Sequence, residues 1–404
     1  GIGSVVIMAQ ACIFDQILDY SSRADPYPLY AELRKTPVAA QGDGNYVVST
    51  YREIVALLHD PRVSSYRLEE GSPGLPAFIR RDPPDHDRLR RVAMRHFGPP
   101  DSPGRIAGLR GEIAELVTGL IDAFDGENPV DIVEAFAYPL PVTVICRLLG
   151  VPREDEPRFR GWSETLVEGL DPRPGDETDL QRRRVAARAE LNAYLNELAE
   201  AHLRRPGDDL LSALVTDDGA EGRMSREELL STASLLLVAG HETTVNLIAN
   251  GMLTLLRHPD VLQRLRREPD LIVGVVEELL RYEPPVHFPP QRTALADIQI
   301  AGTTIPKGAT ITLALAAGDR DPDRFDDPDR FDPDRQRIEH LGFGSGIHLC
   351  FGAPLARIET QLALTDLARR LENPRLVTDP PPYRQNPALR GPRHLLVQID
   401  GISS

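Results

Sequence analysis

The sequence predicts a mainly α-helical protein with a smaller β-rich part. Apolar residues recur at helical spacing along several long segments, whereas the segments that read as strands are short. The predicted helices span 26–35, 51–59, 105–124, 134–149, 153–168, 180–204, 225–258, 271–281 and 353–371. The predicted strands are 46–48, 395–399 and short pieces within 286–311, where Gly302, Pro306 and Gly308 interrupt the chain.

The composition is that of a globular protein and excludes some functions. Of the 404 residues, 41% are hydrophobic and 26% are charged, and the net charge of −15 argues against a general nucleic-acid binder. The cysteines, Cys12, Cys146 and Cys350, are odd in number and far apart, so we expect a reducing compartment and no disulfide framework. No apolar run reaches the ~18 residues that suggest a membrane span.

The segment from Phe343 to Gly352 reads Phe-Gly-Ser-Gly-Ile-His-Leu-Cys-Phe-Gly, with Cys350 just before the predicted helix 353–371. Its glycines let backbone approach a flat, bulky partner, and the N-terminal end of a helix favours thiolate over thiol. One thiolate without further ligands at zinc spacing does not make a zinc site, but it is enough for a haem iron. The alternative is a buried free cysteine.

A second charged segment lies at 82–91, where prolines and acidic residues predict the start of a helix. His86 and Arg90 are one turn apart, so they share a helix face. Both can donate hydrogen bonds to carboxylates such as haem propionates. The alternative is an ordinary solvated face.

The predicted helix 225–258 contains Ala239-Gly240-His241-Glu242-Thr243-Thr244 within an apolar centre. Glycine inside a helix costs ~1 kcal/mol relative to alanine, and a threonine hydroxyl can bond back to the preceding turn. We therefore predict a local distortion here. Glu242 would be costly if it were buried, ionised and unpaired, so the alternative is that it points to a wet side of the helix.

The predicted helix 271–281 ends before Pro284 and Pro285 and carries Glu278 and Arg281 three residues apart. This spacing allows an ion pair on one helix face.

These segments, taken in order, resemble the motifs of the cytochrome P450 family in its soluble bacterial, ferredoxin-dependent form. The resemblance extends from about residue 25 to residue 399. It implies one cytochrome P450 domain over residues 8–404, with residues 1–7 expected to derive from an expression vector. It also implies the cytochrome P450 fold: a large helical part, a smaller β-rich part, and haem b (iron protoporphyrin IX) buried between the long central helix and the Cys350 segment.

The resemblance also implies roles for individual residues. Cys350 becomes the iron ligand, and Glu242 with Thr243 the acid–alcohol pair that delivers protons to dioxygen. The residues expected to bind the haem are His86, Arg90, Ala239, Gly240, Arg292, Phe343, Gly344, His348, Cys350 and Gly352. Candidates for substrate contact are Val286, His287 and Phe288. The expected structural ion pair is Glu278 with Arg281, joined by Arg330; Arg324 stands in a near-copy of the Arg330 context.

The expected function is that of a haem-thiolate monooxygenase that inserts one oxygen atom from O2 into a C–H or C=C bond of a hydrophobic small molecule. A natural-product hydroxylase or epoxidase is the suggested class. The alternatives are a peroxide-driven peroxygenase of the same fold and a non-catalytic haem sensor. The expected partners are O2, a separate ferredoxin and an NAD(P)H-dependent ferredoxin reductase, with no nucleic acid and no membrane. A cytoplasmic monomer is expected.

Overall fold

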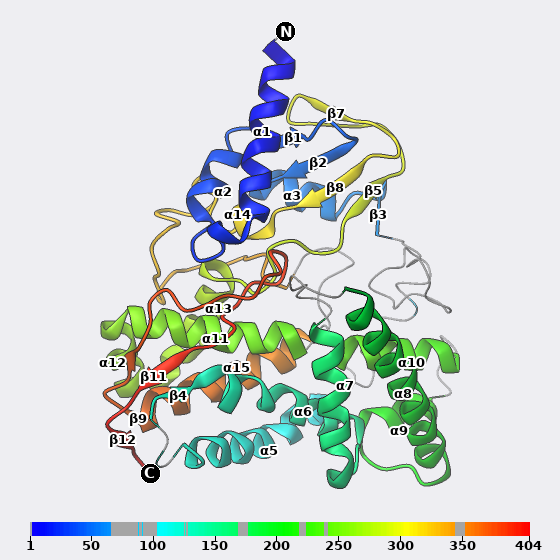
Figure 1. The fold of residues 1–404 in the computed structure, drawn as a ribbon, viewed down its shortest axis with the longest axis vertical. Coiled ribbons are helices and arrows are strands. Elements are labelled where there is room, and N and C mark those ends of the chain that lie inside the picture. Colours follow the sequence, from blue (N-terminus) through cyan, green and yellow to red (C-terminus); the bar gives the residue numbers. More distant parts are fainter. Residues whose placement is uncertain are drawn as a thin grey trace.

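The computed structural model describes residues 2–65, 88, 91, 103–124, 126, 128–168, 177–217, 224–237, 241–343 and 352–404. Figure 1 shows a β-containing part with the first helices at one end of the molecule and a larger helical part at the other. The predicted mainly α-helical architecture with a smaller β-rich part is confirmed.

The chain begins with three helices, α1 (Ile2–Leu18), α2 (Tyr27–Leu33) and α3 (Tyr51–Leu58). Helix α1 passes through Met8 without a break, so the domain boundary expected there is not marked by a change in secondary structure. Its first turns project from the body of the molecule in Figure 1.

The five-stranded sheet joins the N-terminal region to a much later part of the chain. Its order is β1 (Val38–Ala40), β2 (Asn45–Val48), β8 (Thr310–Leu313), β5 (Arg292–Ala294) and β3 (Val63–Ser64). Strands β2 and β8 are parallel, and the other neighbours are antiparallel. Arg292 lies opposite Ile311, so this sheet fixes the position of a predicted haem-binding arginine.

Three smaller sheets complete the β structure among the described residues. The first has the order β10 (Arg375–Leu376), β11 (Leu396–Gln398) and β4 (Val130–Asp131), with β11 in the middle. The other two are pairs: β12 (Gly401–Ile402) with β9 (Leu371–Glu372), and β6 (Ile298–Ile300) with β7 (Thr303–Ile305).

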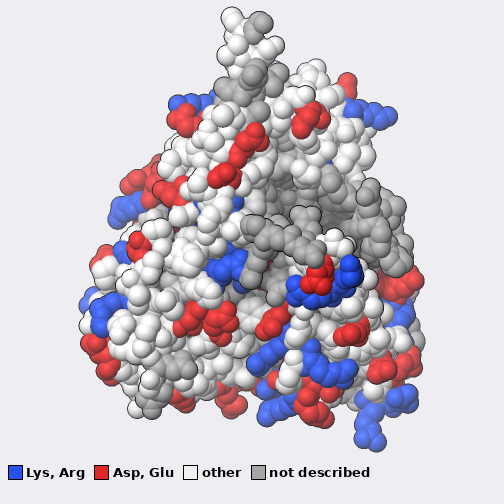
Figure 2. Space-filling model, viewed as in Figure 1, with Lys and Arg blue, Asp and Glu red and all other residues white. Residues whose placement is uncertain are grey.

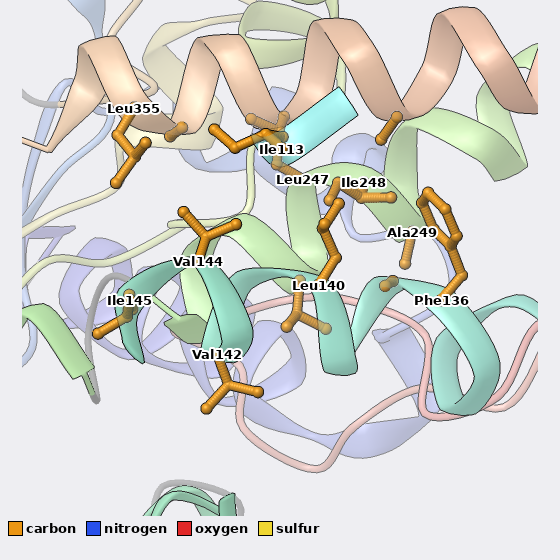
Figure 3. Packing of buried hydrophobic residues seen from close by; sticks show 14 of the residues in the cluster. Ile113, Phe136, Leu140, Val142, Val144, Ile145, Leu247, Ile248, Ala249 and Leu355 are labelled. Carbon is orange, nitrogen blue, oxygen red and sulfur yellow. The ribbon is translucent and has the colours of Figure 1, made fainter. Parts of the chain in front are cut away.

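The helical part surrounds α11. Its helices are α5 (Pro103–Asp122), α6 (Pro139–Leu149), α7 (Glu156–Glu168), α8 (Glu177–Arg204), α9 (Leu210–Val215), α10 (Arg226–Leu235), α11 (His241–Arg257), α12 (Pro259–Arg267), α13 (Ile272–Tyr282) and α15 (Ala353–Arg370). Helix α14 (Leu315–Gly318) instead packs against α2 and α3 in the β-containing part. Figure 3 shows apolar side chains of α5, α6, α11 and α15 meeting in one core. Helix α11 is covered on several sides and is buried nearly all round, including polar residues such as Glu242, Asn246 and Asn250.

The predicted helix 225–258 is interrupted in the structure. Helix α10 ends at Leu235, the backbone at Leu236 and Leu237 is π-helical, and α11 begins at His241. A distortion in this region agrees with the prediction, while residues 238–240 lie outside the described residues.

On the face of the molecule seen in Figure 2, charged side chains of both signs are mixed. Figure 2 shows acidic and basic side chains interspersed over the visible face of the lower, helical part. Within the described ranges, none of the helices combines the length and apolar character needed to span a membrane.

Candidate active site

The segment expected to hold the iron ligand is described only at its two ends. Phe343 is buried beside α13, and Gly352 is the N-cap of α15, which follows as predicted. Apart from Arg292, the other predicted haem contacts lie outside the described residues: His86, Arg90, Ala239, Gly240, Gly344, His348 and Cys350.

The remaining cysteines have environments that disfavour iron binding. Cys146 is buried in α6, and burial raises the pKa of its thiol to about 12. It therefore stays protonated, whereas metal binding requires the thiolate. Cys12 is exposed on α1, far along the chain from α11 and α15. These environments support the choice of Cys350.

Glu242 lies in the first turn of α11 and is buried, with 2% of its surface exposed. Its Oε1 atom is 2.6 Å from Nη1 of Arg384, whose side chain is 11% exposed. The alternative of a wet, solvent-facing glutamate is therefore wrong. Sequence reasoning missed Arg384, although the cost of burying an unpaired carboxylate already called for a cation nearby.

Arg384 is held by a hairpin spanning residues 383–393. Tyr383 pairs with Pro392, and the Arg384 amide donates to the Gly391 carbonyl at 3.1 Å. A Cβ atom at Gly391 would lie 2.2 Å from Asn246 Oδ1, so only glycine allows this approach to α11. Asn250 donates to the Arg390 carbonyl at 3.1 Å. The hairpin thus runs along one face of α11.

Arg390 anchors the same hairpin to the rest of the protein. Its guanidinium is buried, pairs with Glu283, and donates to the carbonyls of Arg23 and Ala24 at 2.7 and 2.9 Å. Arg23 in turn donates to the Arg384 carbonyl at 3.2 Å. The position of Arg384 therefore depends on contacts with the N-terminal region and with the residue that follows α13.

Thr243 follows Glu242 in the first turn of α11 and is half-buried. Adjacent helical residues point about 100° apart, so the two side chains occupy different faces of the same turn. The preceding His241 is fully buried, and burial lowers its pKa to about 4. As a neutral ring that bonds to the Tyr138 carbonyl at 3.1 Å, His241 fixes the start of α11 rather than carrying a charge.

Arg292 offers a buried cation of the kind that a haem propionate requires. It is 5% exposed on β5 and donates to the Pro290 carbonyl. A guanidinium can donate two parallel hydrogen bonds to one carboxylate, so its chemistry suits a haem propionate. The described residues are in this respect compatible with haem.

The three predicted substrate contacts, Val286, His287 and Phe288, all pack against other parts of the protein. His287 is fully buried, its Nδ1 is 2.7 Å from the Tyr30 hydroxyl, and burial lowers its pKa well below the usual range. Phe288 packs edge-on against Phe14 of α1 with ring centres 5.8 Å apart. Val286 pairs with Leu389 of the hairpin. Contact of any of the three with substrate stays a prediction.

The buried pair of Glu278 and Arg281 is confirmed, with 2.5 Å between Oε1 and Nε and neither side chain exposed. Its third member is Arg335, whose Nε lies 3.1 Å from Glu278 Oε2. The prediction of Arg330 is wrong, as is the near-copy Arg324. The Arg330 side chain is exposed, and only its carbonyl takes part, accepting from Arg281 at 3.0 Å.

The reason for this difference lies in how the segment after α14 folds. Arg335 donates to the carbonyls of Asp326, Asp327 and Arg330, so the chain curls around its guanidinium and turns it toward Glu278. The spacing of residues in the sequence does not reveal that the backbone wraps around Arg335, so the partner of Glu278 could not be predicted from it.

Asp131, Glu134 and His394 place possible metal-ligand atoms within 4.8 Å of one another. Asp131 accepts from the amides of Val133 and Leu395 and contacts His394 Nδ1 at 2.7 Å. These bonds give Asp131 a structural role at the junction of β4 and β11.

Comparison with known proteins agrees with this geometry. The family model described as cytochrome P450 matches residues 72–398. The chain is 42% identical over 399 residues to cytochrome P450 monooxygenase PikC of Streptomyces venezuelae, covering 93% of this chain and 91% of that protein. It is 38% identical over 406 residues to 6-deoxyerythronolide B hydroxylase of Saccharopolyspora erythraea, covering 94% and 98%.

A solved structure shows the same fold. Cytochrome P450 CYP109Q5 from Chondromyces apiculatus superimposes with a TM-score of 0.87 at 32% identity, covering 96% of this chain and 98% of that one. The family model, these relatives and this structure all agree with the motifs, so the chain belongs to the cytochrome P450 family.

Proposed function

We propose that this cytochrome P450 monooxygenase oxidises a hydrophobic natural product of the macrolide or polyketide class, inserting one oxygen atom from O2 into a C–H or C=C bond. The observation that carries the substrate class is the likeness to 6-deoxyerythronolide B hydroxylase, which extends over nearly the whole of both chains. Hydroxylation and epoxidation are both compatible with this class.

The cofactor is haem b, which supplies activation of O2 and insertion of the oxygen atom when bound. In this proposal Cys350 is the iron ligand, and Arg292, together with His86 and Arg90, binds the propionates. The predicted contacts at Ala239, Gly240, Phe343, Gly344, His348 and Gly352 border the same group.

Glu242 and Thr243 are proposed to deliver protons to dioxygen. Glu242 is held in a buried ion pair, where its carboxylate can accept a proton and pass it on without exposure to bulk water. Thr243 lies in the same turn and offers a hydroxyl that can donate and accept hydrogen bonds. Arg384 orients the carboxylate and stabilises its charge.

The two alternative functions, peroxygenase and haem sensor, differ from the monooxygenase in their need for proton delivery. A peroxygenase would use hydrogen peroxide, which brings its own protons, so the paired Glu242 and the adjacent Thr243 would be superfluous. A haem sensor would need no proton delivery at all. The buried Glu242–Arg384 pair therefore favours a monooxygenase driven by O2 and external electrons.

The protein takes electrons from redox partners, as its bacterial relatives do. We propose that these partners are a separate ferredoxin and an NAD(P)H-dependent ferredoxin reductase. We further propose a monomer that works in the cytoplasm, in keeping with the few, widely spaced cysteines.

The test begins with a ligand screen that follows the haem spin-state change of the holoprotein across macrolide, polyketide, terpenoid and steroid compounds. Compounds that bind are then offered with NADPH, ferredoxin and reductase, or with peroxide alone. We expect macrolide or polyketide binders and product only with the redox chain. Turnover with peroxide alone would favour the peroxygenase, and absence of product from every binder would favour the sensor.

A further inference from the structure

One carboxylate of α13 joins the two ends of the segment that contains Cys350. Glu277 Oε2 lies 2.6 Å from Nε2 of His340, which precedes the segment. Glu277 Oε1 lies 2.5 Å from Nε of Arg357, in the second turn of α15, which follows the segment. Both ends of residues 344–351 are thus tied to the same side chain.

Phe343, the last described residue before this segment, is held between the same two partners of Glu277. The His340 ring meets the Phe343 ring edge-on with centres 6.0 Å apart. The Arg357 guanidinium lies over the Phe343 ring at 4.9 Å from its centre, a favourable cation–π distance. Removing Glu277 would release both side chains that position this ring.

The backbone is equally constrained where it approaches α13. The Gly342 amide donates to His340 Nδ1 at 3.0 Å, so Nε2 and Nδ1 of one imidazole link Glu277 to the main chain. A Cβ atom at Gly342 would lie 2.8 Å from the Leu280 carbonyl oxygen, so the chain runs directly against α13. The entry to the segment has little freedom to shift while His340 stays bound.

The Glu277 carboxylate at the centre of this cluster carries a stable negative charge. Partial burial raises the pKa of Glu277, but hydrogen bonds from His340 and Arg357 outweigh it and lower the pKa to about 2. Glu277 is therefore ionised at physiological pH and accepts charge-assisted hydrogen bonds, which are stronger than neutral ones. His340 is nearly buried, with 6% of its side chain exposed.

We propose that Glu277 is a positioning residue for the cysteine ligand: by binding His340 and Arg357 together, it sets the separation and orientation of the two ends of segment 344–351. This inference rests on the proposed role of Cys350. A segment whose ends are held in place samples fewer conformations, and groups outside the first ligands control both ligand geometry and redox potential. In this proposal Glu277 controls the geometry of the cysteine ligand and the reduction potential through His340 and Arg357.

The alternative is that Glu277, His340 and Arg357 form an ordinary ion cluster that affects only solubility or stability. The chain offers a matched control, because Glu339 is the neighbour of His340 and its side chain is 80% exposed, 3.6 Å from Arg324. Glu339→Gln removes a negative charge close to His340 but leaves the contacts of Glu277 with His340 and Arg357 intact. Changes caused by charge alone would appear in both variants.

The experiment compares wild type, Glu277→Gln, Glu277→Asp and Glu339→Gln as haem-loaded proteins. Three quantities are measured: the rate at which the reduced carbon monoxide complex converts from the thiolate-ligated to the thiol-ligated spectrum, the rate of haem loss to apomyoglobin, and the reduction potential. Outer-shell partners of a metal typically contribute ~10–100-fold, so we expect Glu277→Gln to raise both rates about tenfold or more. We expect a changed potential, with Glu277→Asp intermediate and Glu339→Gln like wild type.

Equal behaviour of Glu277→Gln and Glu339→Gln in all three measurements would overturn the proposal. If Glu277→Gln does not fold, Arg357→Lys replaces it, since this variant keeps the charge but loses the planar group over Phe343. Unchanged rates and potential in Arg357→Lys would then overturn it. Failure of the proposed ligand is distinguishable, because the thiolate spectrum would then be missing from wild type or would persist in Cys350→Ser.

Discussion

Glu242 and Arg384 form an ion pair with 2.6 Å between Oε1 and Nη1, in which Glu242 is buried and the Arg384 side chain is 11% exposed. One partner belongs to the first turn of α11 and the other to the 383–393 hairpin. Removing two charges from water is costly, and the cost is recovered only while both partners are present in good geometry. The acid proposed to deliver protons is therefore held in place by the C-terminal part of the chain.

Arg384→Gln is expected to destabilise the holoprotein by about 3 kcal/mol, because it removes the cation from a buried carboxylate. Urea unfolding measures this, together with a double-mutant cycle that adds Glu242→Gln. The second change should recover part of the loss. As a control, Arg375→Gln breaks an exposed pair with Asp400 and should leave the stability close to that of wild type. Strictly additive effects of Arg384→Gln and Glu242→Gln would contradict a coupled pair.

Thr243→Ala is expected to uncouple NADPH use from product formation. The hydroxyl is lost from the turn that carries Glu242, so proton delivery is disturbed while O2 and substrate still bind. General acid–base steps contribute ~10²–10⁴-fold, and product formation should fall within that range while peroxide is released. Product and peroxide are measured per NADPH consumed, and Thr243→Ser should restore much of the coupling. A product yield unaffected by Thr243→Ala would exclude the proposed proton role.

Arg335→Ala and Arg330→Ala distinguish the observed ion pair from the one predicted. Arg335→Ala removes a charged hydrogen bond to the buried Glu278 and should cost about 1.5–3 kcal/mol of unfolding free energy. Arg330→Ala removes an exposed side chain and should stay within about 0.5 kcal/mol of wild type. Thermal or urea unfolding gives both values, and the reverse order would show that Arg330 is the partner of Glu278.

Glu359→Gln is expected to stabilise the protein increasingly as pH rises. Glu359 is buried on α15, and burial raises its pKa well above the usual 4.5. The unfolded chain loses this proton near the usual value while the folded chain retains it, so wild type loses stability as pH rises above that value. The difference between variant and wild type should therefore be small at about pH 4 and larger at about pH 8. A difference that does not change with pH would contradict a buried protonated carboxyl.

The parts of the fold that follow from local spacing were predictable. Helices α2, α3, α5, α8, α13 and α15 lie close to their predicted ranges. Helix α12 was missed although it begins at Pro259, a typical first helical position. Helix α1 was missed too.

The candidate site was predictable only where a motif is contiguous. Glu242 and Thr243, or Glu278 and Arg281, stand within one turn of a helix, so spacing alone brings them together. Arg384, Arg335 and the link from Glu277 to both His340 and Arg357 depend on how distant segments pack. Their partners could not be chosen from the sequence, where many arginines look alike.

The most direct test of the account is the absorption spectrum of the reduced carbon monoxide complex in Cys350→Ser and Cys146→Ser. Wild type should show the red-shifted band of a thiolate-ligated haem, Cys350→Ser should lose it, and Cys146→Ser should keep it, since the Cys146 thiol is buried and protonated. Persistence of the band in Cys350→Ser, or its loss in Cys146→Ser, would contradict the assignment of Cys350 as the iron ligand.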